Sequence, residues 1–260
     1  MLMAEIHGHA AAEIAGNEDY LTSAVFGYLR FVYTPSFWEA FFSRARGLPT
    51  EGKEQSLQEY LDCRNIRFSE LTKVEAAFWP AHPRLGTPDV ALCFSGRPDR
   101  SPFVLIIEAK LWSGKSGSGQ DDQLRRYLSV LKSLNTLPLP AAPAALSNAT
   151  TALLYLTPHE SLTELEETSA LCNDEPELRT MLFRAQWQDI LAAAGDARTS
   201  SDRITATILS DVAAFLKTRG LEYFRGFIQQ SLALARRVGW HFLSGEPGVQ
   251  WFLGTPNRII

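Results

Sequence analysis

The chain has 260 residues, of which 45% are hydrophobic and 21% are charged, so it can bury a sizeable core as one large domain or as a domain with an appendage. Its formal net charge of −4 excludes a general attraction to nucleic acid or to acidic membranes, so a polyanion must be held by a local basic patch or through metal ions. Three scattered cysteines without a CxxC pair argue against a disulfide framework and a cysteine zinc site. No apolar run reaches the ~20 residues that span a bilayer, and the N-terminus lacks a basic region typical of a signal peptide, so we expect a cytoplasmic protein.

Residues 1–16 are small and weakly patterned, and we expect them to form a loose N-terminal arm. Asn17 is expected to cap a helix that begins with Glu18, because the start of a helix favours acidic side chains. Glu18 lies three residues before Leu21 and seven before Val25, two residues of the apolar face of this helix. Glu18 is therefore either an acid that complements the helix dipole or an acid directed inward toward a site.

Shorter elements are predicted between this helix and residue 86. In chain order they are an aromatic helix from Phe37 to Ala45 capped by Ser36, a polar linker over 47–55, a helix from about Ser56 to Cys63, and a first strand best seen at Val74–Trp79.

Two apolar runs, Val90–Phe94 and Phe103–Ile107, flank a polar turn rich in Gly, Pro and Ser, which predicts a β-hairpin. Antiparallel pairing about a midpoint near residues 98–99 places Asp89 opposite Glu108, with their Cβ atoms roughly 5 Å apart. The sequence therefore predicts two facing carboxylates at one end of the hairpin.

Lys110 shares the face of Glu108, because side chains alternate along a strand. In one interpretation, Asp89 caps a turn and Glu108 pairs with Lys110 as a solvated strand end. We favour a functional site, because the run FVLII before Glu108 is typical of a buried central strand, where unpaired charge is costly. Oxygen-only ligands suit Mg²⁺ or Mn²⁺, which can polarise a phosphoryl oxygen and activate a water that a lysine orients.

Alternating helices and strands follow. In chain order we expect a helix from about Asp121 to Leu134, a strand over Ala152–Thr157, a helix over Leu162–Leu171, a strand over Met181–Trp187, a helix over Gln188–Ala194, a helix from Ser200–Asp202 to Lys217 with Ile204, Ile208, Val212 and Phe215 on its apolar face, a helix over Leu221–Arg237 and a final hairpin. This order indicates an α/β domain on a mixed sheet over 17–195, with a helical C-terminal extension over 196–260 packed on the core.

The run GTPDVAL, then LIIEAK, then a helix with QLRRY resembles the PD-(D/E)xK nuclease superfamily over roughly residues 17–190. The resemblance implies a restriction-endonuclease-like fold, in which a mixed sheet is flanked by helices. It implies that Asp89, Glu108 and the Ala109 carbonyl are metal ligands, and that Lys110 is the catalytic lysine. Glu18 matches an extra acid that many members carry on their first helix, and would be a further ligand.

The helix after the hairpin supplies candidate supporting residues. Gln123 and Tyr127 match a Q-x-x-x-Y pattern that several members place beside the site, although Tyr127 also fits a core position of its own helix. From Arg97 to Lys132 there are seven basic and four acidic residues, a net charge of 7 − 4 = +3. We therefore expect Lys115 and Arg126 to support the binding of a phosphate-bearing substrate, a solvated helix face being the alternative for Arg126.

One competing motif overlaps the hairpin, because residues 109–116 fit a relaxed P-loop pattern. An alanine at its first position, a bulky Lys-Leu-Trp-Ser run and a delayed helix count against it. The expected function is a Mg²⁺-dependent nuclease that cleaves phosphodiester bonds, with DNA as partner and no membrane. The alternatives are a catalytically silent nuclease-like fold that binds nucleic acid or a protein, and a P-loop NTPase.

Overall fold

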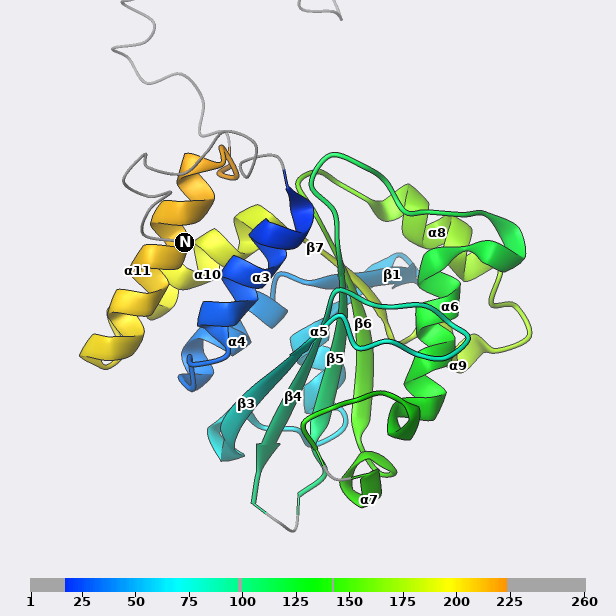
Figure 1. Cartoon of the computed structure of the whole chain (residues 1–260), viewed down its shortest axis with the longest axis horizontal. Helices are drawn as coiled ribbons and strands as arrows, with labels where there is room; N and C mark the ends of the chain where they lie inside the picture. Colours follow the sequence, from blue (N-terminus) through cyan, green and yellow to red (C-terminus); the bar gives the residue numbers. More distant parts are fainter. Residues whose placement is uncertain (1–16, 98–99, 142, 224–260) are drawn as a thin grey trace, which may run out of the picture. The chain divides into compact units, whose positions relative to one another are not determined.

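A mixed β-sheet lies at the centre of the structure. The computed structural model describes residues 17–97, 100–141 and 143–223, and within these ranges the sheet has seven strands in the order β2-β1-β7-β6-β5-β4-β3 (Figure 1). The strands are β1 (Arg46–Thr50), β2 (Lys53–Ser56), β3 (Leu71–Phe78), β4 (Val90–Gly96), β5 (Phe103–Ala109), β6 (Thr150–Thr157) and β7 (Leu182–Gln186). The chain divides after Glu222, and every element described here lies before that point.

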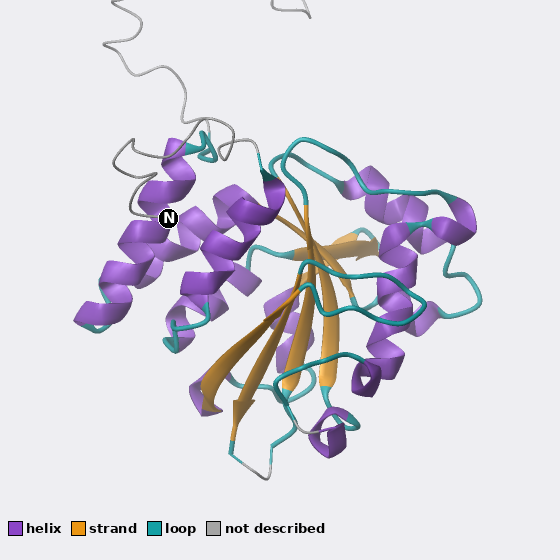
Figure 2. Cartoon of the chain, viewed as in Figure 1, coloured by secondary structure: helices purple, strands orange, loops and turns teal. Residues whose placement is uncertain are grey.

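Helices cover both faces of this sheet (Figure 2). The α-helices are α3 (Glu18–Leu29), α4 (Pro35–Phe42), α5 (Leu57–Asp62), α6 (Gln123–Val130), α7 (Pro143–Leu146), α8 (Leu162–Ala170), α9 (Pro176–Arg179), α10 (Trp187–Ala197) and α11 (Arg203–Thr218), and the 3₁₀ helices are η1 (Phe68–Glu70), η2 (Gly119–Asp121) and η3 (Leu131–Thr136). Buried side chains of α3, α4, α5, α10 and α11 share one hydrophobic cluster with the sheet, and those of α6 and α8 share a second. No helix of the described residues is long and apolar enough to cross a membrane.

The strand directions confirm the predicted α/β fold on a mixed sheet. Strands β3, β4 and β5 form an antiparallel meander, whereas β5, β6 and β7 run parallel. Helix α6 lies between β5 and β6 along the chain and forms the crossover that a parallel connection needs. In β5, Leu105 faces one hydrophobic cluster while Val104 and Ile106 face the other, which explains the uninterrupted apolar run of this strand.

The register of the predicted hairpin is confirmed. Val90 pairs with Ile107 and Phe94 pairs with Phe103, so the next position along the ladder places Asp89 opposite Glu108. The carboxyl end of β5 therefore meets the beginning of β4 at one edge of the sheet, as the sequence predicts.

The prediction of a polar linker over 47–55 is wrong, because this segment forms the antiparallel pair β1 and β2. Its turn has the left-handed backbone that joins two strands tightly, with φ of 53° at Glu51 and 79° at Gly52. Strand β2 is an edge strand in which Lys53, Glu54 and Gln55 are exposed or half-buried, and Glu54 pairs with Arg184 of β7. Such a strand has little of the apolar alternation by which strands are recognised.

The predicted apolar face of helix α11 is confirmed at Val212 and Phe215, which are buried, and Ile208 packs partly buried against the core. The prediction is wrong at Ile204, which is 75% exposed, while Thr205 is buried instead. Asp202 caps the helix by accepting hydrogen bonds from the Ile204 and Thr205 amides and from the Thr205 hydroxyl, which turns Thr205 inward. The helix packs on α10 and α3, and so belongs to the same hydrophobic cluster as the site-bearing strands.

The other helix predictions differ from the structure mainly at their ends. Helix α4 begins at Pro35, a residue favoured in the first helical position, rather than after Ser36. The predicted helix to Leu134 ends as α6 at Val130, because Ser133 leaves helical geometry within η3. The predicted arm over 1–16, the helix over 221–237 beyond Tyr223 and the final hairpin lie outside the described residues.

Candidate active site

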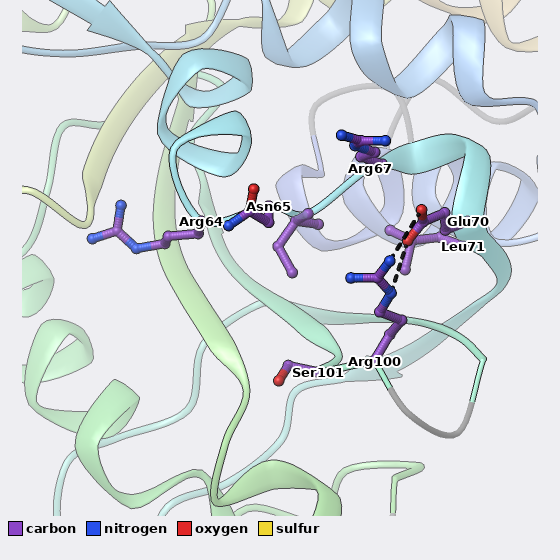
Figure 3. A pocket seen from close by; sticks show the side chains of 8 residues that line it. Arg64, Asn65, Arg67, Glu70, Leu71, Arg100 and Ser101 are labelled. Atoms are coloured by element: carbon purple, nitrogen blue, oxygen red, sulfur yellow. Dashed lines mark hydrogen bonds and ion pairs between the residues drawn. The ribbon is translucent and has the colours of Figure 1, made fainter.

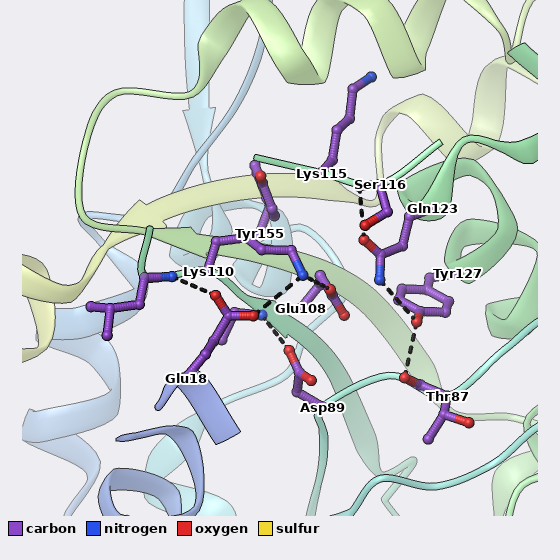
Figure 4. Close-up of polar contacts among 12 residues, drawn as sticks. Glu18, Thr87, Asp89, Glu108, Lys110, Lys115, Ser116, Gln123, Tyr127 and Tyr155 are labelled. Carbon is purple, nitrogen blue, oxygen red and sulfur yellow. Dashed lines mark hydrogen bonds and ion pairs between the residues drawn. The ribbon is translucent and has the colours of Figure 1, made fainter. Parts of the chain in front are cut away.

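Four charged side chains from three segments of the chain converge at one edge of the sheet (Figure 4). Asp89 directly precedes β4, Glu108 is the second-last residue of β5, and Lys110 directly follows β5. Glu18 is the first residue of α3, where Asn17 caps the helix by accepting a hydrogen bond from the Tyr20 amide. The inward orientation that the sequence left open for Glu18 is the one that the structure has.

The four side chains are held by two ion pairs and by two backbone amides. The Lys110 ammonium lies 2.6 Å from Glu108 Oε1 and 3.5 Å from Glu18 Oε1. The Leu111 amide donates a hydrogen bond of 2.7 Å to Glu18 Oε2, and the Ala109 amide donates one of 2.8 Å to Asp89 Oδ2. Three consecutive residues at the end of β5 therefore fix all three carboxylates.

The cluster contains three carboxylates and one ammonium group, and these groups are partly shielded from solvent. Burial raises the pKa of Glu108 to about 8, and the neighbouring Asp89 contributes to the shift while Lys110 opposes it. Burial also raises the pKa of Asp89 to about 6, against the hydrogen bond from Ala109. Burial opposes the charge of Lys110, but Glu108 and Glu18 outweigh it and raise the pKa of the ammonium. Another cation beside these carboxylates would relieve their mutual repulsion.

The donor atoms fit a hard divalent cation in part. Glu108 Oε2 is buried and has no hydrogen-bond partner, and the hydrogen bond to Asp89 Oδ2 leaves Oδ1 for a ligand. These oxygens are the type that Mg²⁺ and Mn²⁺ prefer. Among the described residues, no group of three or more His, Cys, Asp or Glu side chains is already arranged to hold a metal, and Glu18 faces Lys110 and the Leu111 amide instead.

Gln123 and Tyr127 join the two loops that flank the cluster. The Tyr127 hydroxyl donates a hydrogen bond of 2.9 Å to the Thr87 carbonyl and accepts one of 3.3 Å from the side-chain Nε2 of Gln123. Gln123 Oε1 in turn accepts a hydrogen bond of 3.1 Å from the Ser116 amide. Tyr127 is buried in the second hydrophobic cluster, so it is both a core residue and a support for the loop before Asp89.

Lys115 lies apart from the carboxylates, and its side chain points away from them (Figure 4). Its ammonium is 2.6 Å from Asp122 Oδ2 and 3.2 Å from Glu167 Oε2, and it donates a hydrogen bond of 3.1 Å to the Thr168 hydroxyl. Helix α6 begins at Gln123, eight residues after Lys115 (123 − 115 = 8). A P-loop needs a lysine directed at phosphate and a helix that begins beside it, and neither is found here.

Arg126 is half-buried near the loop that precedes Asp89. One of its terminal nitrogens, Nη1, lies 3.6 Å from the position that a Cβ on Gly86 would occupy. Its Nε is buried without a hydrogen-bond partner, and no carboxylate of the described residues pairs with its guanidinium. Arg126 is therefore a positive charge that can accept an anionic ligand beside the site.

Trp187 is a residue of the site that the sequence did not indicate. Its indole N–H donates a hydrogen bond of 2.9 Å to the Lys110 carbonyl from the first position of α10. The signal for it was indirect: Lys110 and Trp187 each follow a strand, and parallel strands bring their carboxyl ends to one edge. That β5 and β7 were close in the sheet could not be inferred from their patterns alone.

A second polar region lies at the opposite end of strands β3 to β5, seven residues or roughly 20 Å away along β4. It is a cavity of about 150 Å³ lined by Arg64, Arg67, Arg100 and Glu70, among others (Figure 3). Arg100 Nε lies 3.0 Å from Glu70 Oε2, so part of its charge is neutralised. This cavity has no pair of acids with a lysine, and it is not part of the candidate active site.

The cluster of Glu18, Asp89, Glu108 and Lys110 combines carboxylates that can hold a cation with an ammonium group that can orient water or stabilise negative charge. Comparison of the chain with protein-family models, with curated proteins and with solved structures finds no match. The function must therefore be argued from the geometry of this cluster.

Proposed function

We propose that this chain is a metal-dependent nuclease that hydrolyses phosphodiester bonds in DNA, in the cytoplasm. The observation that carries the proposal is the register of β4 and β5, which extends one position beyond Val90 and Ile107 to place Asp89 opposite Glu108, with the Lys110 ammonium 2.6 Å from Glu108. The β3-β4-β5 meander, the α6 crossover and the parallel strand β6 follow in the order that the PD-(D/E)xK resemblance implies, which supports a restriction-endonuclease-like fold.

The residues present are suited to Mg²⁺ or Mn²⁺. Asp89 and Glu108 would hold the ion together with the Ala109 carbonyl, and Glu18 is a predicted further ligand. When bound, the ion would supply a polarised phosphoryl oxygen and a water of lowered pKa. Glu108 Oε2 is buried and lacks a hydrogen-bond partner, so a bound cation would satisfy this oxygen.

Side chains of the protein would position the attacking water and the phosphate and would supply positive charge beside them. Lys110 is held between Glu108 and Glu18, so its ammonium can orient the attacking water or stabilise charge that develops on the phosphate. Arg126 would bind a phosphate beside the site, and Gln123 and Tyr127 would hold the loops that carry Asp89 and Lys110.

A second candidate is a nuclease-like fold that binds nucleic acid or a protein without cleavage. It is favoured by the fact that Lys110 neutralises part of the acidic charge, and that the described residues contain no preformed group of three metal-ligating side chains. A rise of the melting temperature on addition of Mg²⁺ or Mn²⁺ that is lost in Asp89→Ala would favour the nuclease.

The direct test is cleavage of single-stranded and duplex DNA with Mg²⁺ or Mn²⁺. We expect Asp89→Ala and Lys110→Ala each to lower the rate by about 100-fold or more, since each removes a group that acts on the reacting phosphate. Lys53→Ala is the matched control, because Glu51-Gly52-Lys53 repeats the E-x-K pattern in the β1–β2 turn. Cleavage at the wild-type rate in both site variants would contradict the assignment.

A further inference from the structure

Two exposed tryptophans are attached to the backbone close to residues of the carboxylate cluster. Trp112 is 76% exposed and is the second residue after Lys110. Trp79 is 43% exposed, and its backbone N–H donates a hydrogen bond of 2.9 Å to the Asp89 carbonyl. Since consecutive residues advance at most about 3.6 Å, Trp112 is attached within roughly 7 Å of Lys110, while the hydrogen bond places Trp79 directly beside the backbone of Asp89.

Neither indole is needed for the core. Both tryptophans are absent from the two hydrophobic clusters, whereas Trp38 and Trp187 are fully buried in one of them. Indole is a large apolar group that folding normally buries in large part. The Trp79 ring contacts Phe78 on one side, with a centroid distance of 5.9 Å, but it stays 43% exposed, and Trp112 is 76% exposed. A ligand that covers both indoles would explain why they remain accessible beside one cluster of charges.

The backbone of Trp79 adds an independent observation. Its φ of 48° lies in the left-handed region, which is unfavourable for a bulky side chain. Strain of this kind persists where the surrounding structure requires it, and it concentrates at ligand-binding positions. Here the hydrogen bond to the Asp89 carbonyl holds the strained residue against the candidate active site.

We propose that Trp79 and Trp112 are stacking platforms for unpaired nucleobases beside the Asp89–Glu108–Lys110 cluster, so that the substrate is single-stranded DNA. The inference rests on the nuclease function proposed above and names its substrate class. An indole face can stack on an unpaired base, whereas the faces of bases inside a duplex are already covered by their neighbours.

The charge of the protein favours the same substrate. Duplex binding depends mainly on basic residues that neutralise phosphates, but the chain has a net charge of −4. Beside the cluster, Arg126 is basic without a carboxylate partner among the described residues, whereas Lys110 and Lys115 are ion-paired. Base stacking can provide the affinity that this weak electrostatic attraction does not, and it acts on every base type.

The test is binding of a fluorescent single-stranded oligonucleotide and of its duplex to the full-length protein in EDTA, where metal-dependent cleavage is prevented. We expect Trp79→Ala and Trp112→Ala each to weaken single-strand binding roughly 5- to 150-fold per lost stacked base, with less effect on the duplex. Trp112→Phe should keep most of the affinity. Tyr33→Ala is the matched control, because Tyr33 is 49% exposed but lies beyond the other end of α3 from Glu18.

Three outcomes would overturn the inference. The variant that lacks both tryptophans could bind the single strand as tightly as the wild type does, or the tryptophan variants could lose as much affinity for the duplex as for the single strand. The wild type could also bind an oligonucleotide without bases as tightly as one with bases. Metal-dependent cleavage that Lys110→Ala abolishes while both tryptophan variants bind normally would leave the nuclease standing and reject the platforms. Single-strand binding through the tryptophans without cleavage would reject the nuclease alone. A protein that neither binds nor cleaves DNA would reject both.

Discussion

Glu108 carries its charge at a position where ionisation opposes folding. Burial and the nearby Asp89 raise its pKa from 4.5 to about 8. Between these values the folded chain binds more protons at Glu108 than the unfolded chain does. The contribution of this residue to the unfolding free energy therefore decreases as the pH rises through this range. The same burial leaves Oε2 without a partner, so the residue is kept at some cost in stability.

We expect the metal-free wild type to lose stability relative to Glu108→Gln as the pH rises from 4.5 to about 8. The relative loss should be on the order of a few kcal/mol, and urea unfolding in EDTA across this range measures it. Glu51→Gln, in the exposed β1–β2 turn, should instead follow the wild type at every pH. Parallel curves for the wild type and Glu108→Gln would contradict the raised pKa.

At the scale of elements, the segment between β5 and α6 is fixed at several points. The Leu111 amide binds Glu18, the Lys115 amide donates a hydrogen bond of 3.0 Å to Glu164 Oε1, and the Lys115 ammonium pairs with the fully buried Asp122. Asp122 also caps α6 by accepting a hydrogen bond from the Arg125 amide. The buried Lys115–Asp122 ion pair therefore joins this loop to α6, and the hydrogen bond to Glu164 joins the loop to α8.

Lys115→Ala should lower the unfolding free energy by about 3–5 kcal/mol, because it leaves the buried Asp122 carboxylate without its cation. Lys73→Ala removes an exposed pair with Glu75 on β3 and should cost less than about 1 kcal/mol. Chemical denaturation at neutral pH compares the two. Equal small losses would show that the Lys115 pair is no stronger than a surface contact.

Pattern and burial explain which elements the sequence could predict. The β4–β5 hairpin was predictable in register, because both strands are apolar and their lengths fix the pairing of Asp89 with Glu108. The β1–β2 pair was not, since it contains few apolar residues, β2 lies at the sheet edge, and the turn is marked only by Glu51 and Gly52. Helical spacing left two orientations open for Glu18, because the inward one depends on how α3 packs on the sheet and brings Glu18 to the Leu111 amide.

Across the whole molecule, the site depends on packing between distant segments. Trp187 lies 77 residues after Lys110 and donates its indole N–H to the Lys110 carbonyl. No local pattern in the sequence predicts that contact, because it requires β5, β6 and β7 to be adjacent and in register. Through Trp187, the helical layer that contains α10 restrains the backbone that carries the candidate catalytic lysine.

Trp187→Phe should lower the unfolding free energy by about 1 kcal/mol through the lost hydrogen bond, yet slow DNA cleavage about 10-fold or more through a displaced Lys110. Trp38→Phe is the matched control: its indole N–H donates a hydrogen bond of 2.8 Å to the Val32 carbonyl in the same cluster. It should show a similar loss of stability with normal cleavage. A similar loss of cleavage in both variants would mean that stability alone explains the effect.

The anchoring of the carboxylates to backbone amides has a consequence for how this chain can change through evolution. Asp89 and Glu18 are bound by the amides of residues 109 and 111, which every amino acid except proline can supply. Substitutions at these two positions can keep both anchors as long as the new side chain fits the buried space. The geometry of the site can therefore be kept while the sequence around it changes. Distant descendants would then share the arrangement of the site residues more than a recognisable sequence motif.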